Sequence, residues 1–229
     1  MWYGSPMEIH GKSAWEVRRH SKAAPWTYAR KDERQRELMR AGEGRFLLSE
    51  VSPVITLGRR AGADQLLASP DDFASRGVEV LTTDRGGLAT YHGPGQWVLF
   101  PVFPLARLVG DSRGVRKAVE GLLEIGVRAA RQFDCPAEIR GGTQTGVWTA
   151  RGKLASVGVQ IVDGWLLHGL AINFFRTPES FFGINPCGLC ASADFVFSEP
   201  PASALFDEAG QVITRATEAV YGSAENSIF

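Results

Sequence analysis

The sequence predicts an α+β domain in which helices flank a central sheet that is mostly antiparallel or mixed. One observation is the run of strand-like segments at 146–150, 153–162 and 165–174. The other is that helix-like segments, at 112–133 and 202–222, stand before and after these strands and do not alternate with them. Successive strands with helices at the ends are typical of α+β folds.

Size and composition predict one large domain. The chain has 229 residues, of which 44% are apolar and six are tryptophans, which is ample for a packed core. Residues 1–24 are weakly patterned, so we expect an irregular N-terminal arm followed by a single domain over 25–229.

The charge balance excludes some classes of partner. Lys plus Arg equals Asp plus Glu at 25 each, which argues against nucleic-acid binding and against a polybasic membrane anchor. No run of about 18 apolar residues and no secretion signal is present, so we expect no membrane association and a cytoplasmic location. Three cysteines are then expected to be free thiols.

The first half predicts a charged helix and several strands. The segment 25–44 opens with a proline and closes with glycines, which predicts a solvated, charged helix. Strands are expected at 45–51, 53–58 and 78–83, with a short helix at 69–77 that Ser69 caps.

The second half predicts the buried part of the sheet. The apolar segment 97–105 indicates a buried strand whose prolines place it near an edge or a bulge. Segment 112–133 has the longest apolar helical face. The pair Asp163-Gly164 predicts a two-residue hairpin, and 202–222 predicts a closing amphipathic helix.

The stretch "TDRGGLATYHGPGQW" predicts a loop that lines a ligand pocket. Gly86 and Gly87 let backbone N–H groups approach a ligand, and Arg85 can meet an anion or a carbonyl. The stretch is neither a Walker A loop nor a dinucleotide fingerprint, because the required spacing is missing.

Cys187 is the candidate nucleophile. It lies in "GINPCGLC", where Pro186 and Gly188 favour a presented thiol over a packed one, although most free cysteines are buried hydrophobes. Cys135 is expected to be structural and Cys190 is ambiguous. The two cysteines of "CGLC" lack a second cluster at zinc spacing, so no metal site is expected.

A reactive thiol needs a cation nearby, because its ordinary pKa of about 8.5 leaves little thiolate at neutral pH. The candidates are His92, His168 and Lys153. On its own, His168 fits a core histidine and Lys153 a solvated hairpin lysine. However, the small residues Ser156 and Gly158 after Lys153 would let a ligand lie against the strand. Acyl transfer through a thioester fits this set of residues.

Five segments in order carry a resemblance to a known family. They are "TLGRR", "TTDRGGLATYHGPGQWVLFP", "GVWTARGKLASVGVQ", "HGLAINF" and "INPCGL". Together they resemble the lipoyl(octanoyl) transferases of lipoic acid biosynthesis, over about residues 45–190. The resemblance implies the catalytic-domain fold of the biotin and lipoate protein ligases.

The resemblance also implies residue roles. Cys187 would carry the acyl group as a thioester, and Lys153 would tune it. The acyl pocket wall would be Arg85, Gly86, Gly87, Leu88, Ala89, Thr90, Tyr91, His92, Ser156, Val157, Gly158, Gly169, Leu170 and Ala171. The donor would be octanoyl-acyl carrier protein, and no cofactor would be needed. The acceptors would be lysines on lipoyl domains of 2-oxoacid dehydrogenase complexes and on the glycine cleavage H protein.

The chain departs from the family pattern at three places. Val51 and Ser52 stand where the family usually has a histidine-proline pair, Leu88 replaces a common acidic residue, and the arm 1–24 matches poorly. Two alternatives stay open. One is an ATP-dependent lipoate-protein ligase of the same fold, and the other is a non-catalytic acyl- or lipoyl-binding protein.

Overall fold

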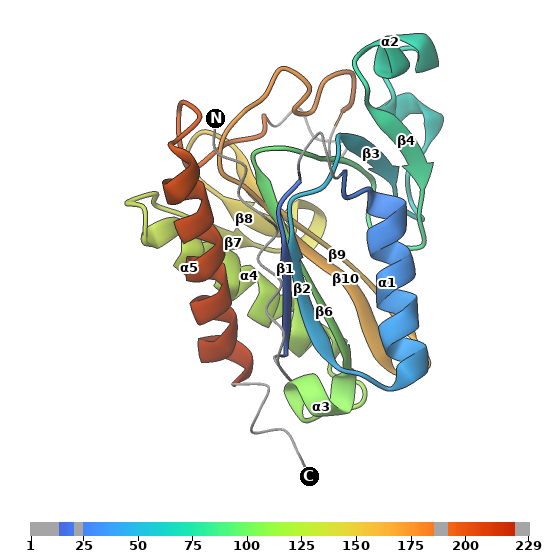
Figure 1. Cartoon of the computed structure of the whole chain (residues 1–229), viewed down its shortest axis with the longest axis vertical. Coiled ribbons are helices and arrows are strands. Elements are labelled where there is room, and N and C mark those ends of the chain that lie inside the picture. The colour runs from blue at the N-terminus through green and yellow to red at the C-terminus, as the bar shows by residue number, and fades with distance from the viewer. Residues whose placement is uncertain (1–13, 21–24, 186–191, 223–229) are drawn as a thin grey trace.

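The computed structural model describes residues 14–20, 25–185 and 192–222, and it contains a seven-stranded mixed sheet (Figure 1). In spatial order, the strands are β1 (Trp15–Arg18), β2 (Arg45–Ser49), β6 (Gln96–Pro104), β10 (Trp165–Asn173), β9 (Lys153–Val162), β8 (Gly146–Trp148) and β7 (Glu138–Arg140). Only β1 and β2 pair in parallel, and the other neighbours are antiparallel. The predicted α+β class with a mostly antiparallel sheet is confirmed.

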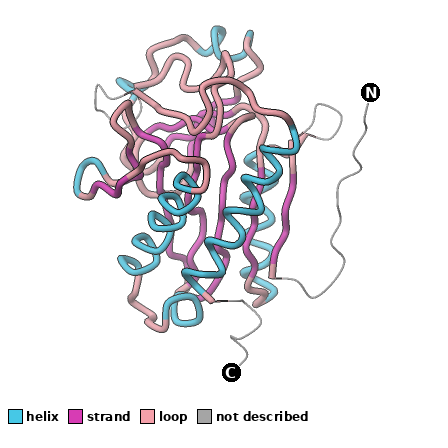
Figure 2. The backbone as a smooth tube through the Cα atoms, turned by 90° about the vertical axis from the view of Figure 1, so that its left-hand side faces the viewer, coloured by secondary structure: helices cyan, strands magenta, loops and turns pink. Residues whose placement is uncertain are grey.

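Helices cover both faces of this sheet (Figure 2). Helix α1 (Tyr28–Ala41) packs on one face, and α4 (Val115–Arg131) and α5 (Ser203–Tyr221) pack on the other. Short α3 (Leu105–Val109) follows β6. The core on the α4 and α5 side is the larger of the two, because both helices bury an apolar stripe against the sheet.

A second, three-stranded sheet lies above one end of the first (Figure 1). Its order is β4 (Glu79–Thr82), β3 (Val54–Leu57) and β5 (Ala89–His92). Beside it lie η1 (Ala63–Gln65) and α2 (Pro70–Ser75), and Ser69 and Asp72 form a capping box at the start of α2. The helix and cap expected here are confirmed, whereas β5 forms inside the segment that the sequence predicts as a loop.

The prediction of a solvated α1 is wrong for one face of the helix. Tyr28, Lys31, Gln35 and Leu38 are buried and recur at helical spacing. The Lys31 ammonium donates to the Val98 carbonyl at 2.9 Å, and burial lowers the pKa of Lys31 well below its usual value. The apolar pattern does not reveal this buried face, because half of its inward residues are polar.

The strand at 97–105 was expected near an edge or a bulge, and the edge is wrong, because β6 lies between β2 and β10 in the middle of the sheet. Pairing with β10 stops at Leu166 and resumes at Leu170, and Pro101 lies in this interval. There His168 has φ 60° and donates its backbone N–H to Gln35 on α1 at 2.6 Å. Pro101, which has no backbone N–H, is tolerated because β10 does not pair with β6 at this point and the His168 N–H bonds to α1 instead.

The N-terminal arm is partly regular. Residues 15–18, expected to be irregular, form β1, and the Trp15 ring stacks on Phe46 at 4.8 Å. The hairpin at Asp163 and Gly164 is confirmed, since both residues have positive φ as a type I′ turn requires.

Candidate active site

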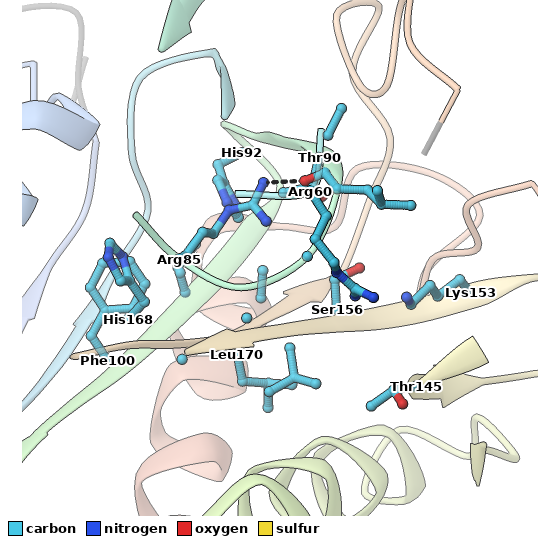
Figure 3. Close-up of a pocket in the computed structure, with 18 of the residues that line it drawn as sticks. Arg60, Arg85, Thr90, His92, Phe100, Thr145, Lys153, Ser156, His168 and Leu170 are labelled. Carbon is cyan, nitrogen blue, oxygen red and sulfur yellow. Dashed lines mark hydrogen bonds between the residues drawn. The ribbon is translucent and has the colours of Figure 1, made fainter. Parts of the chain in front are cut away.

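A cavity of about 120 Å³ lies between the two sheets, and it is far larger than one water molecule needs. It follows β9 and β10, with Lys153 and Thr145 at one end and His168 and Phe100 at the other (Figure 3). Every residue expected on the acyl pocket wall lines this cavity except Gly86 and Tyr91, and Lys153 lines it as well.

The Arg85 guanidinium holds the glycine loop to β3. It donates to the Thr56 carbonyl at 2.6 Å and hydroxyl at 2.8 Å, to the Gly86 carbonyl at 3.0 Å, and to the Leu88 carbonyl at 2.8 Å. Arg85 as a whole residue is 6% exposed. Of the two partners expected for Arg85, an anion or a carbonyl, the structure shows carbonyls, and these belong to the protein, so Arg85 shapes the loop.

The glycines of this loop permit a close approach of two protein segments. The Gly86 N–H donates to the Val159 carbonyl at 3.0 Å. A Cβ atom on Gly158 would lie 2.8 Å from the Gly86 carbonyl oxygen. Bare backbone is therefore needed where the loop crosses β9. Gly87, with φ 99°, lies beyond this crossing and lines the cavity.

Tyr91 and His92 point in opposite directions because they are neighbours on β5. His92 lines the cavity, whereas Tyr91 packs behind β5 with Phe181 at 5.7 Å between ring centroids. Of this pair, His92 lines the cavity and Tyr91 does not.

A chain of amide side chains fixes the tautomer of His92. Gln96 donates its Nε2 to the Tyr91 carbonyl at 3.2 Å and to Asn173 Oδ1 at 2.8 Å, so its Oε1 is the acceptor for His92 Nδ1 at 2.7 Å. His92 then carries its proton on Nδ1. Asn173 in turn donates to the carbonyls of Lys153 and Asp194. The hydrogen-bonded chain joins the wall at His92 to the start of β9.

Three stacked rings line the end of the cavity away from Lys153. The Tyr28 ring lies 5.3 Å from that of His92 and 6.3 Å from that of His168, both nearly parallel, and the Tyr28 hydroxyl lies 3.1 Å from His168 Nδ1. Burial, aided by the Arg85 charge, lowers the pKa of each histidine to about 3. Burial raises the pKa of Tyr28. All three rings are uncharged at neutral pH, so this end suits an uncharged group.

Lys153 lies across β8. A Cβ atom on Gly146 would lie 2.4 Å from Lys153 Cε, so the lysine stem occupies the space that this glycine leaves. The ammonium lies 5.7 Å from the centroid of the Trp148 ring. The Trp148 indole is itself held by the Gln144 carbonyl at 2.7 Å. Lys153 is thus packed on its own hairpin and directed along the cavity, unlike a freely solvated lysine.

Two of the cysteines, Cys187 and Cys190, lie outside the described residues. Cys135 is buried after α4, and its burial raises the pKa of the thiol, as suits a structural residue. Within residues 14–20, 25–185 and 192–222, no group of three or more His, Cys, Asp or Glu side chains is placed to hold a metal ion.

Sequence reasoning missed several residues of the cavity. Tyr28 lies on the helix that was expected to be solvated, and Phe100 lies on the strand that was expected to be buried. Arg60 ends the motif "TLGRR", and Thr145 directly precedes "GVWTA". The signal for Gly146 was its place at the start of "GVWTA", directly beside the lysine hairpin. Nothing in the sequence marked Tyr28, because only folding brings α1 against β10.

Comparison with known proteins supports the resemblance. Residues 27–214 match the family model described as the lipoyl protein ligase A/B catalytic domain. The chain belongs to this family. It is 41% identical over 146 residues to an octanoyltransferase of Desulfotalea psychrophila, covering 63% of this chain and 64% of that protein. It is 36% identical over 200 residues to an octanoyltransferase of Chloroflexus aurantiacus, covering 85% and 87%.

Solved structures of the family share the fold. A T. acidophilum lipoate protein ligase with bound lipoic acid superposes with a TM-score of 0.66 at 11% identity, covering 91% of this chain and 85% of that one. At this identity the likeness concerns the fold alone, and it confirms the expected fold of the ligase catalytic domains. In the part of the chain that the structure describes, no helix is long and apolar enough to cross a membrane.

Proposed function

We propose that this member of the lipoyl protein ligase A/B family is an octanoyltransferase that acts in lipoic acid biosynthesis. The observation that carries the proposal is the cavity along β9 and β10, which has an ammonium group at one end and uncharged rings at the other. The named octanoyltransferases among its relatives support the same activity.

The size of the cavity suits an eight-carbon chain. Its lining runs along β9 from Lys153 to the level of Val159, which pairs with His168. The six residue steps from Lys153 to Val159 span about 20 Å of strand. An extended octanoyl chain is roughly 9 Å long, given carbon–carbon bonds of about 1.5 Å. The chain and its thioester therefore fit with the carbonyl near Lys153 and the methyl end toward the rings.

In the proposed mechanism, the Cys187 thiolate attacks the thioester carbonyl of octanoyl-acyl carrier protein. The new carbon–sulfur bond forms, and the phosphopantetheine thiolate leaves with the proton that Cys187 gave up. A lysine amine of a lipoyl domain then attacks the acyl-enzyme and forms an amide. Its proton returns to the Cys187 sulfur, and Lys153 carries protons in both steps. The donor thioester supplies the activation, so neither nucleotide nor metal takes part.

The proposal extends to partners and to the organisation of the chain. The acceptors would be lipoyl domains of 2-oxoacid dehydrogenase complexes and the glycine cleavage H protein. Residues 25–229 would act as one catalytic domain in the cytoplasm, preceded by an arm over 1–24.

The test is the intact mass of the protein after incubation with octanoyl-acyl carrier protein without ATP. We expect one octanoyl adduct, which is absent in Cys187→Ser and kept in the matched variant Cys190→Ser. Transfer to a lipoyl domain should require the adduct. Transfer only with free octanoate and ATP would indicate a ligase, and binding without adduct or transfer would indicate a non-catalytic protein.

A further inference from the structure

A buried carboxylate outside the cavity ties the segment after residue 191 to the turn that precedes Lys153. Asp194 is 7% exposed. Its Oδ2 accepts a hydrogen bond from the Thr149 hydroxyl, and its Oδ1 accepts one from Arg151 Nε at 2.9 Å. The same Thr149 oxygen accepts the Arg151 backbone N–H at 3.0 Å. The carboxylate therefore closes a compact turn at the end of β8.

The backbone around Asp194 holds Lys153 directly. The Lys153 N–H donates to the Ser192 carbonyl at 2.9 Å, and the Asp194 N–H donates to the Lys153 carbonyl at 3.0 Å. From the side of β10, Asn173 Nδ2 donates to the Asp194 carbonyl at 3.1 Å and reaches the Lys153 carbonyl at 3.4 Å. Hydrogen bonds from the segment 192–194 and from Asn173 at the end of β10 thus fix the backbone of Lys153 on two sides.

The approach of this segment is itself specified by the sequence. A Cβ atom on Gly152 would lie 2.2 Å from the Ser192 carbonyl oxygen, so only glycine lets the two segments come together here. The contact between Gly152 and Ser192 therefore depends on the glycine that the sequence places in this hairpin.

Among the described residues that line the cavity, Asp194 is hydrogen-bonded directly to Lys153 alone, so its effect on the reaction is expected mainly through Lys153. The ion pair with Arg151 contributes little, because the arginine side chain is 69% exposed. The buried hydrogen bond with Thr149 matters more, since a buried acceptor without its donor is costly. We propose that Asp194, held by Thr149, is a positioning residue that fixes where Lys153 enters the cavity. This inference rests on the proposed transferase function.

The main test compares Asp194→Asn with wild type in steady-state octanoyl transfer and in the pH profile of Lys153 acetylation by acetic anhydride, read by peptide mass spectrometry. We expect kcat to fall about tenfold or more with little change in KM, since small displacements of a reacting group cost up to about 100-fold. The acetylation profile of Lys153 should shift. Asp207→Asn is the matched control, because it removes an exposed carboxylate that pairs with Arg19 and it leaves Lys153 untouched.

Substitutions of Thr149 provide a second test, and they leave the net charge of the protein unchanged. Thr149→Val should lower kcat as Asp194→Asn does, and Thr149→Ser should restore it. The double variant should be no worse than the poorer single one, because the two side chains act as a unit. If Asp194→Asn does not fold, the Thr149 pair decides the question alone.

Two results would overturn the positioning role. One is a wild-type kcat together with an unchanged Lys153 acetylation profile in Asp194→Asn or Thr149→Val. The other is equal loss in Thr149→Ser and Thr149→Val. If wild type itself transfers no octanoyl group, the proposed function fails, while the acetylation profiles still show whether Asp194 positions Lys153.

Discussion

Gly146→Ala is expected to displace Lys153 while leaving every ionisable group in place. The new methyl carbon would lie 2.4 Å from Lys153 Cε and 2.8 Å from the Ala155 carbonyl oxygen. The lysine stem can move, but the carbonyl belongs to β9 and cannot move freely. Gly146 also has φ 158°, a region that residues with a side chain rarely adopt.

These two effects set the magnitude. Backbone strain costs about 1–3 kcal/mol, and overpacking costs about 1–3 kcal/mol more. For a chain of this size each kcal/mol lowers Tm by about 2–4 °C, so a fall on the order of 10 °C is expected. Well below that Tm, the variant is folded. Transfer should then fall by up to about 100-fold, because the ammonium no longer lies along the cavity.

The assay measures transfer per folded molecule, with folding followed by circular dichroism. Gly110→Ala is the matched control. Gly110 has φ 73° with no atom within 4 Å of an added Cβ, so the substitution adds strain without a clash. It should lower Tm and keep full activity. Transfer by folded Gly146→Ala within twofold of wild type would refute the idea that this glycine directs Lys153.

Three further outcomes are expected. Lys153→Met should slow alkylation of Cys187 by iodoacetamide at neutral pH. Lys153→Arg should keep the rate of alkylation but lose octanoyl transfer, since arginine holds its proton. An unchanged pH profile of alkylation in Lys153→Met would show that Lys153 does not act on the Cys187 thiol. The pKa values of His92 and His168 fall from 6.5 in the unfolded chain to about 3 when folded. The unfolded chain therefore binds more protons between these values. Stability is full above about pH 6.5 and falls on acidification by about 1.4 kcal/mol per pH unit for each histidine. Urea unfolding at pH 7 and pH 5.5 measures this, and equal stability at both would contradict the buried neutral state. Cys135→Ser should transfer at the wild-type rate, and a folded but inactive variant would give Cys135 a role in the chemistry.

Polar burial explains why the fold was easier to anticipate than the site. The spacing of apolar residues and the turn residues predicted α4, α5, β9 and β10, because those elements bury apolar side chains in the core. The inward face of α1 carries Lys31 and Gln35, whose burial depends on acceptors in β6 and β10. No local pattern can report a partner that is more than 60 residues away in the chain.

The sequence by itself determined the α+β class and the hairpin at Asp163, because element order and local turn chemistry depend on neighbouring residues. The five ordered motifs carried the resemblance to the family, and that resemblance implied which segments meet at the cavity. The tertiary structure decided what the residues of those segments do. It turned Tyr91 away while His92 faces the cavity, used the Arg85 donors to shape the loop, and laid Lys153 over Gly146. Side-chain direction and close backbone approach arise only when strands far apart in the chain pair and pack.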